Sequence, residues 1–271
     1  MKEYVRVTDV IDYLICPRKV FLKRIEGYSE ETRYEMLRGE IIHSFFEKLN
    51  KLEKDIVYQI LDFKPYEAIY KIYKDASLKI IDEILKEKEE EIEKIDANIL
   101  DLKFDVIFHT EYEIVERALN VYRTMKEKDI YGIELWEELK PKLLSEVEVL
   151  SEKERIFGRI DRIEDFGDYI NAIEIKTSQK KYPNYLHKVQ LALYKYLCYE
   201  NFPRKILKGT YLYYTYSRKK IKIDISNKFI NKVLSIKDKV LEILEEKKDP
   251  GVQNKKYCSK CSFYPICYKW R

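Results

Sequence analysis

The sequence predicts an α/β fold: a helical N-terminal lobe, a sheet-containing core and a cysteine cluster at the C-terminus. Three observations predict it. Apolar residues recur at helical spacing through roughly the first half of the chain, the period changes to two from Glu146, and three cysteines lie close to the end. With 271 residues, 45% of them hydrophobic, the chain can bury a sizeable core as one or two domains.

The N-terminal residues 1–50 are expected to be helical. Thr8 can cap a first helical run from Val10 to Leu14. Pro17 suits the first turn of a second helix, because proline at that position sacrifices no intrahelical hydrogen bond. A third helix is expected from about Glu31 to Leu49.

Residues 51–140 form a long charged region that we expect to be a helical insertion without catalytic groups. Two stripes at helical spacing indicate helices that pack together or against the core. The stripes are Ile69, Tyr73, Ala76, Ile80 and Ile84, and Ile114, Ala118, Leu119, Tyr122 and Met125. The charged run 86–94 is typical of a solvated helix face.

The core is predicted over residues 141–247. Strands are expected over Glu146–Val149, Arg155–Ile163 and Tyr169–Ile175, in succession as a meander. A helix carrying Gln190 and Tyr194 follows, then a strand pair at Lys208–Tyr216 and Lys220–Ile225 and a last helix at about 226–247. The segment 248–271 closes the chain.

The hairpin between the second and third strands brings two carboxylates together. Paired residues of an antiparallel hairpin keep a constant sum of residue numbers, so a two-residue Gly167-Asp168 turn sets Asp161 opposite Glu174. Like charges at that separation are destabilising unless something positive lies between them, and a divalent cation is the natural candidate. Alternation places Lys176 on the face of Glu174, where it can stabilise charge on a phosphate or activate a water beside the metal. A solvated ion cluster is the alternative, but the apolar residues alternating with these acids indicate a central strand.

Five cysteines in a chain with no apolar leader and no run long enough to cross a membrane are unlikely to form disulfides. A cytoplasmic protein is expected. Cys258, Cys261 and Cys267 supply three thiols, and Cys16 is the obvious fourth ligand of a soft-metal site. Spacing alone leaves zinc and an iron-sulfur cluster equally open. Cys198, within an apolar helical run, is expected to be an ordinary buried cysteine.

Other polar side chains could complete the carboxylate site. His43 lies on a helix that enters the core and could bind the same cation. Gln190 and Tyr194, one helical turn apart, could offer an amide and a phenol to a phosphate or base. Each of the three, taken alone, is more commonly a packing residue.

The ordered motifs Gly39-x3-His43, Gly158-x2-Asp161, Glu174-x-Lys176-Thr177 and Gln190-x3-Tyr194 resemble the RecB-like branch of the PD-(D/E)XK nucleases. With the cysteines before and after them, they resemble the CRISPR-associated exonuclease, the fourth Cas protein family. The resemblance implies a restriction-endonuclease-like core with a mixed central sheet flanked by helices. It implies the following roles: Mg²⁺ or Mn²⁺ bound by His43, Asp161, Glu174 and Ile175; catalysis by Asp161, Glu174, Lys176, Gln190 and Tyr194; and an iron-sulfur cluster, usually [4Fe-4S], on Cys16, Cys258, Cys261 and Cys267.

Function follows from the same resemblance. It implies exonuclease action on single-stranded DNA, expected 5′ to 3′, in CRISPR spacer acquisition together with the integrase complex and with no membrane partner. The long interval between His43 and Asp161 departs from the compact family pattern. A stand-alone nuclease of DNA repair or mobile elements, a non-catalytic DNA-binding adaptor and a zinc-bound structural protein are the alternatives. The residues themselves give neither cleavage polarity nor oligomeric state.

Aromatic residues offer one further hypothesis. The chain has 24 tyrosines, and the segment Tyr211–Tyr216 is followed by Arg218, Lys219 and Lys220. Stacking of bases on such rings beside cations holds single strands without reading their sequence. About half of the tyrosines on an alternating strand are nevertheless expected to face the core.

Overall fold

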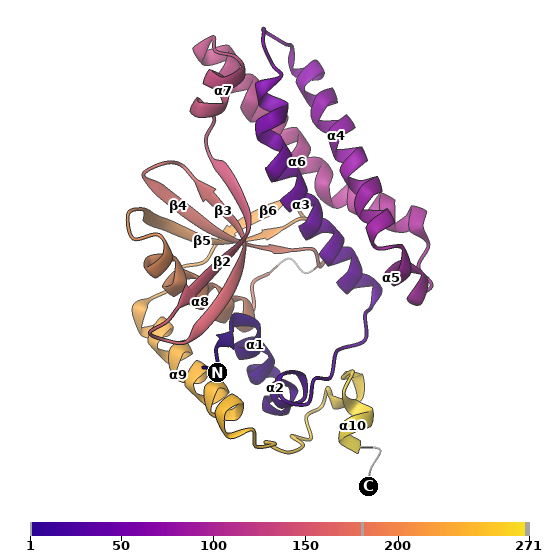
Figure 1. Ribbon diagram of the computed structural model, residues 1–271, viewed down its shortest axis with the longest axis vertical. Helices are drawn as coiled ribbons and strands as arrows, with labels where there is room; N and C mark the ends of the chain where they lie inside the picture. The colour runs from indigo at the N-terminus through magenta and orange to yellow at the C-terminus, as the bar shows by residue number, and fades with distance from the viewer. Residues whose placement is uncertain (1, 180–181, 269–271) are drawn as a thin grey trace.

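The computed structural model describes residues 2–179 and 182–268, and Figure 1 shows the arrangement. The last three residues of the predicted 248–271 segment lie outside the described ones. The elements, in chain order, are β1 Val5–Arg6, α1 Val7–Ile15, α2 Pro17–Arg24, α3 Tyr34–Tyr58, α4 Tyr66–Glu87, α5 Glu89–Lys94, α6 Ile99–Lys128, α7 Gly132–Glu138, β2 Lys142–Ser151, β3 Ile156–Asp165, β4 Tyr169–Lys176, α8 Tyr185–Asn201, β5 Ile206–Tyr214, β6 Lys219–Lys222, α9 Asn227–Glu246, a 3-10 turn Cys258–Lys260 and α10 Tyr264–Tyr268.

The sheet is mixed, as expected. Its strand order is β1-β3-β4-β5-β6, with β2 also paired to β3. The pairs β1/β3 and β4/β5 are parallel, and β2/β3, β3/β4 and β5/β6 are antiparallel. Because β2 pairs along one edge of β3, β1 and β4 must share the other edge. On that second edge, residues 158–161 lie between β1 and β4 and pair with neither strand.

The predicted hairpin turn is confirmed. The Phe166 N–H donates to the Tyr169 carbonyl at 3.0 Å across the Gly167-Asp168 turn. Gly167 has φ +98, a conformation that this two-residue turn requires and that residues with a Cβ adopt at a cost. The ladder then pairs Arg162 with Ile173 in the predicted register.

Two apolar clusters cover the two faces of the sheet, which makes β4 a buried central strand. On one face, apolar residues of α3 and α6 form one cluster with Ile173, Ile175 and Tyr213, and α4 packs on α3 and α6. On the other face, α1, α8 and α9 pack against strand residues that include Ala172 and Leu212. The expectation that the helices of 51–140 pack together or against the core is therefore confirmed, since their apolar residues share one cluster with residues of α3 and of the sheet. Figure 1 shows α4 lying alongside α3 and α6.

Several boundaries differ from the prediction: β2 extends beyond Glu146–Val149 at both ends and β6 ends at Lys222, before the predicted Ile225. The first helix begins at Val7, because β1 leads directly into it and the Arg6 N–H donates to the Asp9 carboxylate at 2.8 Å, so Thr8 lies inside the helix and does not cap it. The third helix runs to Tyr58 because buried residues continue its apolar face through Ile56 and Val57. It therefore crosses the predicted boundary at residue 50. The strand β5 begins and ends two residues earlier than expected.

No helix in the described part of the chain is long and apolar enough to span a bilayer.

Candidate active site

Three carboxylates form a row across neighbouring strands of the sheet. Glu146 lies on β2, Asp161 on β3 and Glu174 on β4. The ladder pairs on either side of Glu146 put it opposite Asp161, and the last pair of the next ladder puts Asp161 opposite Glu174. Regular pairing is interrupted at this row, and Glu146 itself has φ +52. The three acids thus lie at one level of the sheet, where the strands separate.

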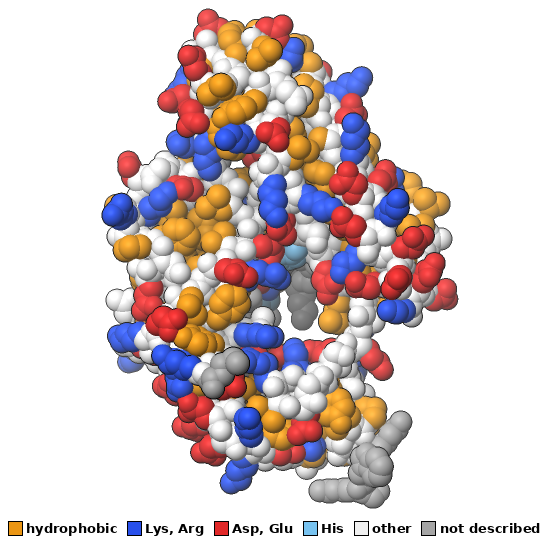
Figure 2. All heavy atoms as spheres, viewed as in Figure 1, with side chains coloured by type: hydrophobic (Ala, Val, Ile, Leu, Met, Phe, Trp, Pro, Cys, Tyr) orange, Lys and Arg blue, Asp and Glu red, His pale blue; other side chains and the backbone are white. Residues whose placement is uncertain are grey.

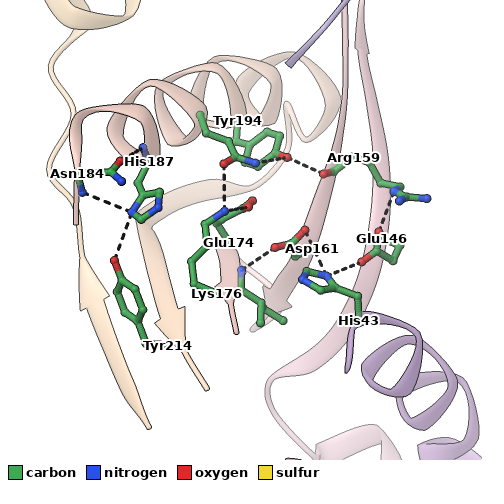
Figure 3. A network of polar contacts seen from close by, with 12 residues as sticks. His43, Glu146, Arg159, Asp161, Glu174, Lys176, Asn184, His187, Tyr194 and Tyr214 are labelled. Carbon is green, nitrogen blue, oxygen red and sulfur yellow. Dashed lines mark hydrogen bonds and ion pairs between the residues drawn. The ribbon is translucent and has the colours of Figure 1, made fainter. Parts of the chain in front are cut away.

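His43 joins this row from α3. Its Nδ1 lies 3.1 Å from Glu146 Oε1 and 3.6 Å from Asp161 Oδ1 (Figure 3). Burial lowers the pKa of His43, but Asp161, Glu146 and Glu174 outweigh burial and raise it to about 9. One ligand atom from each of His43, Glu146 and Asp161 falls within 4.8 Å of the others, so the three converge on a volume that one ion could occupy.

The remaining oxygens fit a divalent cation. Glu174 Oε2 is buried and has no hydrogen-bond partner within the described residues, which is costly unless a ligand or ion satisfies it. Asp161 Oδ2 accepts the Ile175 N–H at 2.6 Å, so the backbone of Ile175 orients this carboxylate. Burial, together with the neighbouring Glu174, raises the pKa of Asp161 to about 7. Several oxygens with one imidazole are a ligand set that suits Mg²⁺ or Mn²⁺.

A chain of hydrogen bonds orients the lysine of the site. Lys176 Nζ lies 2.5 Å from Glu174 Oε1 and 3.3 Å from Gln190 Oε1. Gln190 Nε2 lies 3.2 Å from the Tyr194 hydroxyl, which donates to the Arg159 carbonyl at 2.7 Å. Burial lowers the pKa of Lys176, but the nearby carboxylates outweigh this and raise it, so the side chain is an ammonium. Figure 3 shows these side chains converging from β3, β4 and α8.

Close packing of α8 against the unpaired stretch of β3 makes this chain of hydrogen bonds possible. A Cβ on Gly158 would lie 2.9 Å from Val7 Cγ2, 3.1 Å from Leu197 Cδ1 and 3.2 Å from Tyr194 Cε1. Only glycine admits such an approach without a shift of its neighbours. Gly158 therefore lets Tyr194 reach the Arg159 carbonyl beside Asp161.

The site opens into a groove of about 840 Å³ between α3, α1, β2, β3 and α8. Three cations, Arg6, Lys88 and Arg159, line it together with the acids. Figure 2 shows the surface hollowed between the helical lobe, which we define as α3 to α7, and the N-terminal helices α1 and α2. Glu35, Glu40, Glu47 and Glu148 line the groove as well, so acidic side chains outnumber the cations and a bound metal ion would be needed to admit a phosphodiester.

The four cysteines of the predicted cluster line a second cavity of about 440 Å³. Cys16 caps α2, whereas Cys258, Cys261 and Cys267 belong to the C-terminal segment. Polar contacts hold the ends together: Arg18 Nη2 lies 2.8 Å from the Asp249 carboxylate, and the Ile15 carbonyl accepts hydrogen bonds from the side chains of Lys255 and Tyr257. Four thiols around one cavity are a donor set that fits a soft metal or an iron-sulfur cluster.

Cys198 is buried, as expected, at 1% exposure within α8. The tyrosine segment of β5 is largely buried too: Tyr213 and Tyr214 are 6% and 0% exposed, and only Tyr216 is well exposed, at 38%. Base stacking on this strand is thus restricted to its end.

Glu146 was missed by the sequence analysis, which used it only to mark the start of a strand. The rule that paired residues of a hairpin keep a constant sum of residue numbers, which paired Asp161 with Glu174, also predicts the position of Glu146. A turn centred between Lys153 and Glu154 sets Glu146 opposite Asp161, and the charged segment after Ser151 is where such a turn was to be expected.

A family model described as the PD-(D/E)XK nuclease superfamily matches residues 7–268. The chain is also similar to two solved structures. One is a "Putative exonuclease" from Eubacterium rectale, with 12% identity and a TM-score of 0.48, covering 96% of this chain and 88% of that one. The other is SSO0001, with 20% identity and a TM-score of 0.33, covering 67% and 78%. No curated protein matches the sequence.

Proposed function

Because this chain belongs to the PD-(D/E)XK nuclease superfamily, we propose that it is a metal-dependent exonuclease acting on single-stranded DNA. The observation that carries the proposal is the row of Glu146, Asp161 and Glu174 beside His43, with one oxygen of Glu174 buried and unpartnered within the described residues. A bound cation would satisfy this oxygen, which otherwise stays buried at a cost to the stability of the fold.

In this proposal His43, Glu146, Asp161 and Glu174 hold Mg²⁺ or Mn²⁺. When bound, such an ion supplies Lewis-acid activation of the phosphoryl group and a nucleophile derived from water. The Lys176 ammonium, held by Glu174 and Gln190, stabilises negative charge that develops on the phosphate oxygens.

Gln190 and Tyr194 have positioning roles in the same proposal. The Tyr194 hydroxyl is anchored on the Arg159 carbonyl and fixes the Gln190 amide, which in turn fixes the lysine. Ile175 contributes its backbone N–H to Asp161.

The biological setting proposed is CRISPR spacer acquisition with the integrase complex, in the cytoplasm and with 5′-to-3′ cleavage. Its support is the resemblance of the ordered motifs and of the cysteine pattern. The same pattern supports an iron-sulfur cluster on Cys16 and the three C-terminal cysteines. Anaerobically purified protein should then be brown and contain about four irons for a cubane cluster. Colourless protein with a single tightly bound zinc would rule the cluster out.

Nuclease activity is tested with purified protein, single-stranded DNA and Mn²⁺. We expect Glu174→Gln and Lys176→Met each to abolish cleavage, whereas Glu148→Gln, which changes an exposed acid that also lines the groove, should cut as the unchanged protein does. Mn²⁺ binding followed calorimetrically should be lost in Glu174→Gln and retained in Lys176→Met. Protein that binds DNA but never cuts it would favour the adaptor alternative.

A further inference from the structure

The helix α6 presents an apolar face that no other described element covers. Leu100, Phe104 and Phe108 recur every fourth residue and are 61%, 69% and 44% exposed. Residues at that spacing lie on one face of a helix, about 6 Å apart along its axis. Large exposed apolar residues scattered singly are ordinary, but a continuous row of them indicates an interaction surface.

The row ends near the backbone of the strand end that carries Lys176. The Phe108 ring lies 5.4 Å from the ring of Tyr216, which follows β5, and the His109 ring lies 6.0 Å from the same tyrosine. His109 Nδ1 is 2.6 Å from Thr215 Oγ1, and the Thr215 N–H donates to the Lys176 carbonyl at 3.0 Å. A single layer of residues thus separates the exposed rings from the backbone of the proposed catalytic lysine.

A cation accompanies the rings at this end. The Arg218 guanidinium lies 5.9 Å from the ring centres of both Phe108 and Tyr112. It is exposed and forms no ion pair with any described carboxylate. Asp105, which follows Phe104 in α6, is paired with Arg38 at 3.2 Å and with the Tyr34 hydroxyl. A phosphate would therefore meet an available guanidinium here.

We propose that Phe104, Phe108, Tyr216 and Arg218 form a stacking platform for single-stranded DNA, holding the substrate strand alongside α6 before or after it passes Lys176. The proposal rests on the proposed nuclease function and adds how the substrate is held. Steps of about 6 Å between rings on α6 exceed the 3.4 Å rise per base of duplex DNA, so the platform suits an extended strand with separated bases. Rings hold any base through its π face, and Arg218 neutralises the backbone between them.

The test measures DNA binding separately from cleavage. Fluorescence anisotropy of a labelled oligothymidine is followed without metal, with a matched strand that lacks bases as the second probe. We expect Phe108→Ala and Tyr216→Ala each to weaken binding of oligothymidine by roughly five- to tenfold and to leave the abasic strand unaffected, because only stacking is removed. Arg218→Ala should weaken the binding of both probes. It should also reduce the slope of log affinity against log salt concentration by about 0.7, which corresponds to the loss of one phosphate contact.

Phe63→Ala is the matched control, because Phe63 is 53% exposed near the far tip of the helical lobe. Its binding should equal that of the unchanged protein. Cleavage with Mn²⁺ is measured on the same preparations, so the two proposals fail differently. If the unchanged protein cuts DNA and both Phe108→Ala and Tyr216→Ala bind oligothymidine normally, the stacking platform is wrong and the proposed nuclease function stands. Equal binding of oligothymidine and the abasic strand by the unchanged protein would also overturn it, as would ring variants that change only the oligomeric state.

Discussion

Glu113 lies at the centre of a buried ion network that joins the helical lobe to the sheet. Its Oε1 accepts from Arg117 Nε at 2.8 Å and its Oε2 accepts from Arg162 Nη1 at 3.1 Å. Arg117 also reaches Glu53 Oε2 on α3 at 2.9 Å. No side chain of the Glu113, Arg117 and Arg162 cluster is more than 8% exposed. Glu113 thus joins α6 to β3, and Arg117 joins the same network to α3 through Glu53.

Glu113→Gln keeps the shape of this side chain and removes its charge. Two buried guanidinium groups then lose their shared partner, and breaking a buried ion pair from one side costs about 3 to 5 kcal/mol. The pKa of Glu113 gives a similar value for this loss of stability. Burial raises the pKa of Glu113, but Arg162 and Arg117 outweigh it and lower it from 4.5 to about 2. A change of that size corresponds to about 3 kcal/mol of stabilisation of the charged form.

Urea unfolding at neutral pH measures this loss. With an m-value of about 3 kcal/mol/M, the midpoint of Glu113→Gln should fall by about 1 M. Glu116→Gln is the control, because Glu116 is exposed on the same helix and its change should stay within about 0.5 kcal/mol. If the two variants unfold at the same midpoint, the network does not stabilise the fold and this reasoning is wrong.

The pH dependence provides a second readout with a definite sign. Because the pKa of Glu113 is lower in the folded state, its contribution is complete above about pH 4.5 and is lost as the pH falls toward 2. The difference between the unchanged protein and Glu113→Gln should shrink over that window. A difference that stays constant down to pH 2 would contradict the assignment.

Three further predictions concern the site. Gly158→Ala should cost about 1 to 3 kcal/mol in thermal unfolding, because the new Cβ would meet Val7 at 2.9 Å and Tyr194 at 3.2 Å; a stable variant would show that α8 can move away. Glu146→Gln should lower Mn²⁺ affinity by about 10- to 100-fold by calorimetry, and unchanged affinity would remove it from the ligand set. Gln190→Ala should lower kcat while leaving Mn²⁺ binding intact, and a variant with normal kcat would refute its positioning of the lysine.

The sequence predicted those parts of the site that local chemistry determines. A glycine at the turn fixed the register of the β3/β4 hairpin, and register alone brought Asp161 opposite Glu174. The helix at Pro17 followed in the same way from the proline in its first turn. Local signals suffice where one short turn decides which residues face each other.

Other features depend on tertiary packing and gave no such signal. In the sequence, Glu53, Glu113 and Arg117 look like the charged residues of a solvated helix face. In the fold they are buried against each other and against Arg162. A buried ion pair and an exposed one have the same amino-acid composition. The sequence of the charged region 51–140 therefore could not show that some of its charged residues are buried in the core.

Alternation along β3 connects this network to the site. Asp161 and Arg162 are adjacent, so their side chains point to opposite faces of the strand. Arg162 is held by Glu113 from the helical lobe, while Asp161 faces Glu174 and receives His43 from α3. The helices on this face of the sheet thus supply one proposed metal ligand, His43, and hold Arg162, the neighbour of a second proposed ligand, Asp161. A helix between residues 51 and 140, α6, thus contacts the strand that carries Asp161.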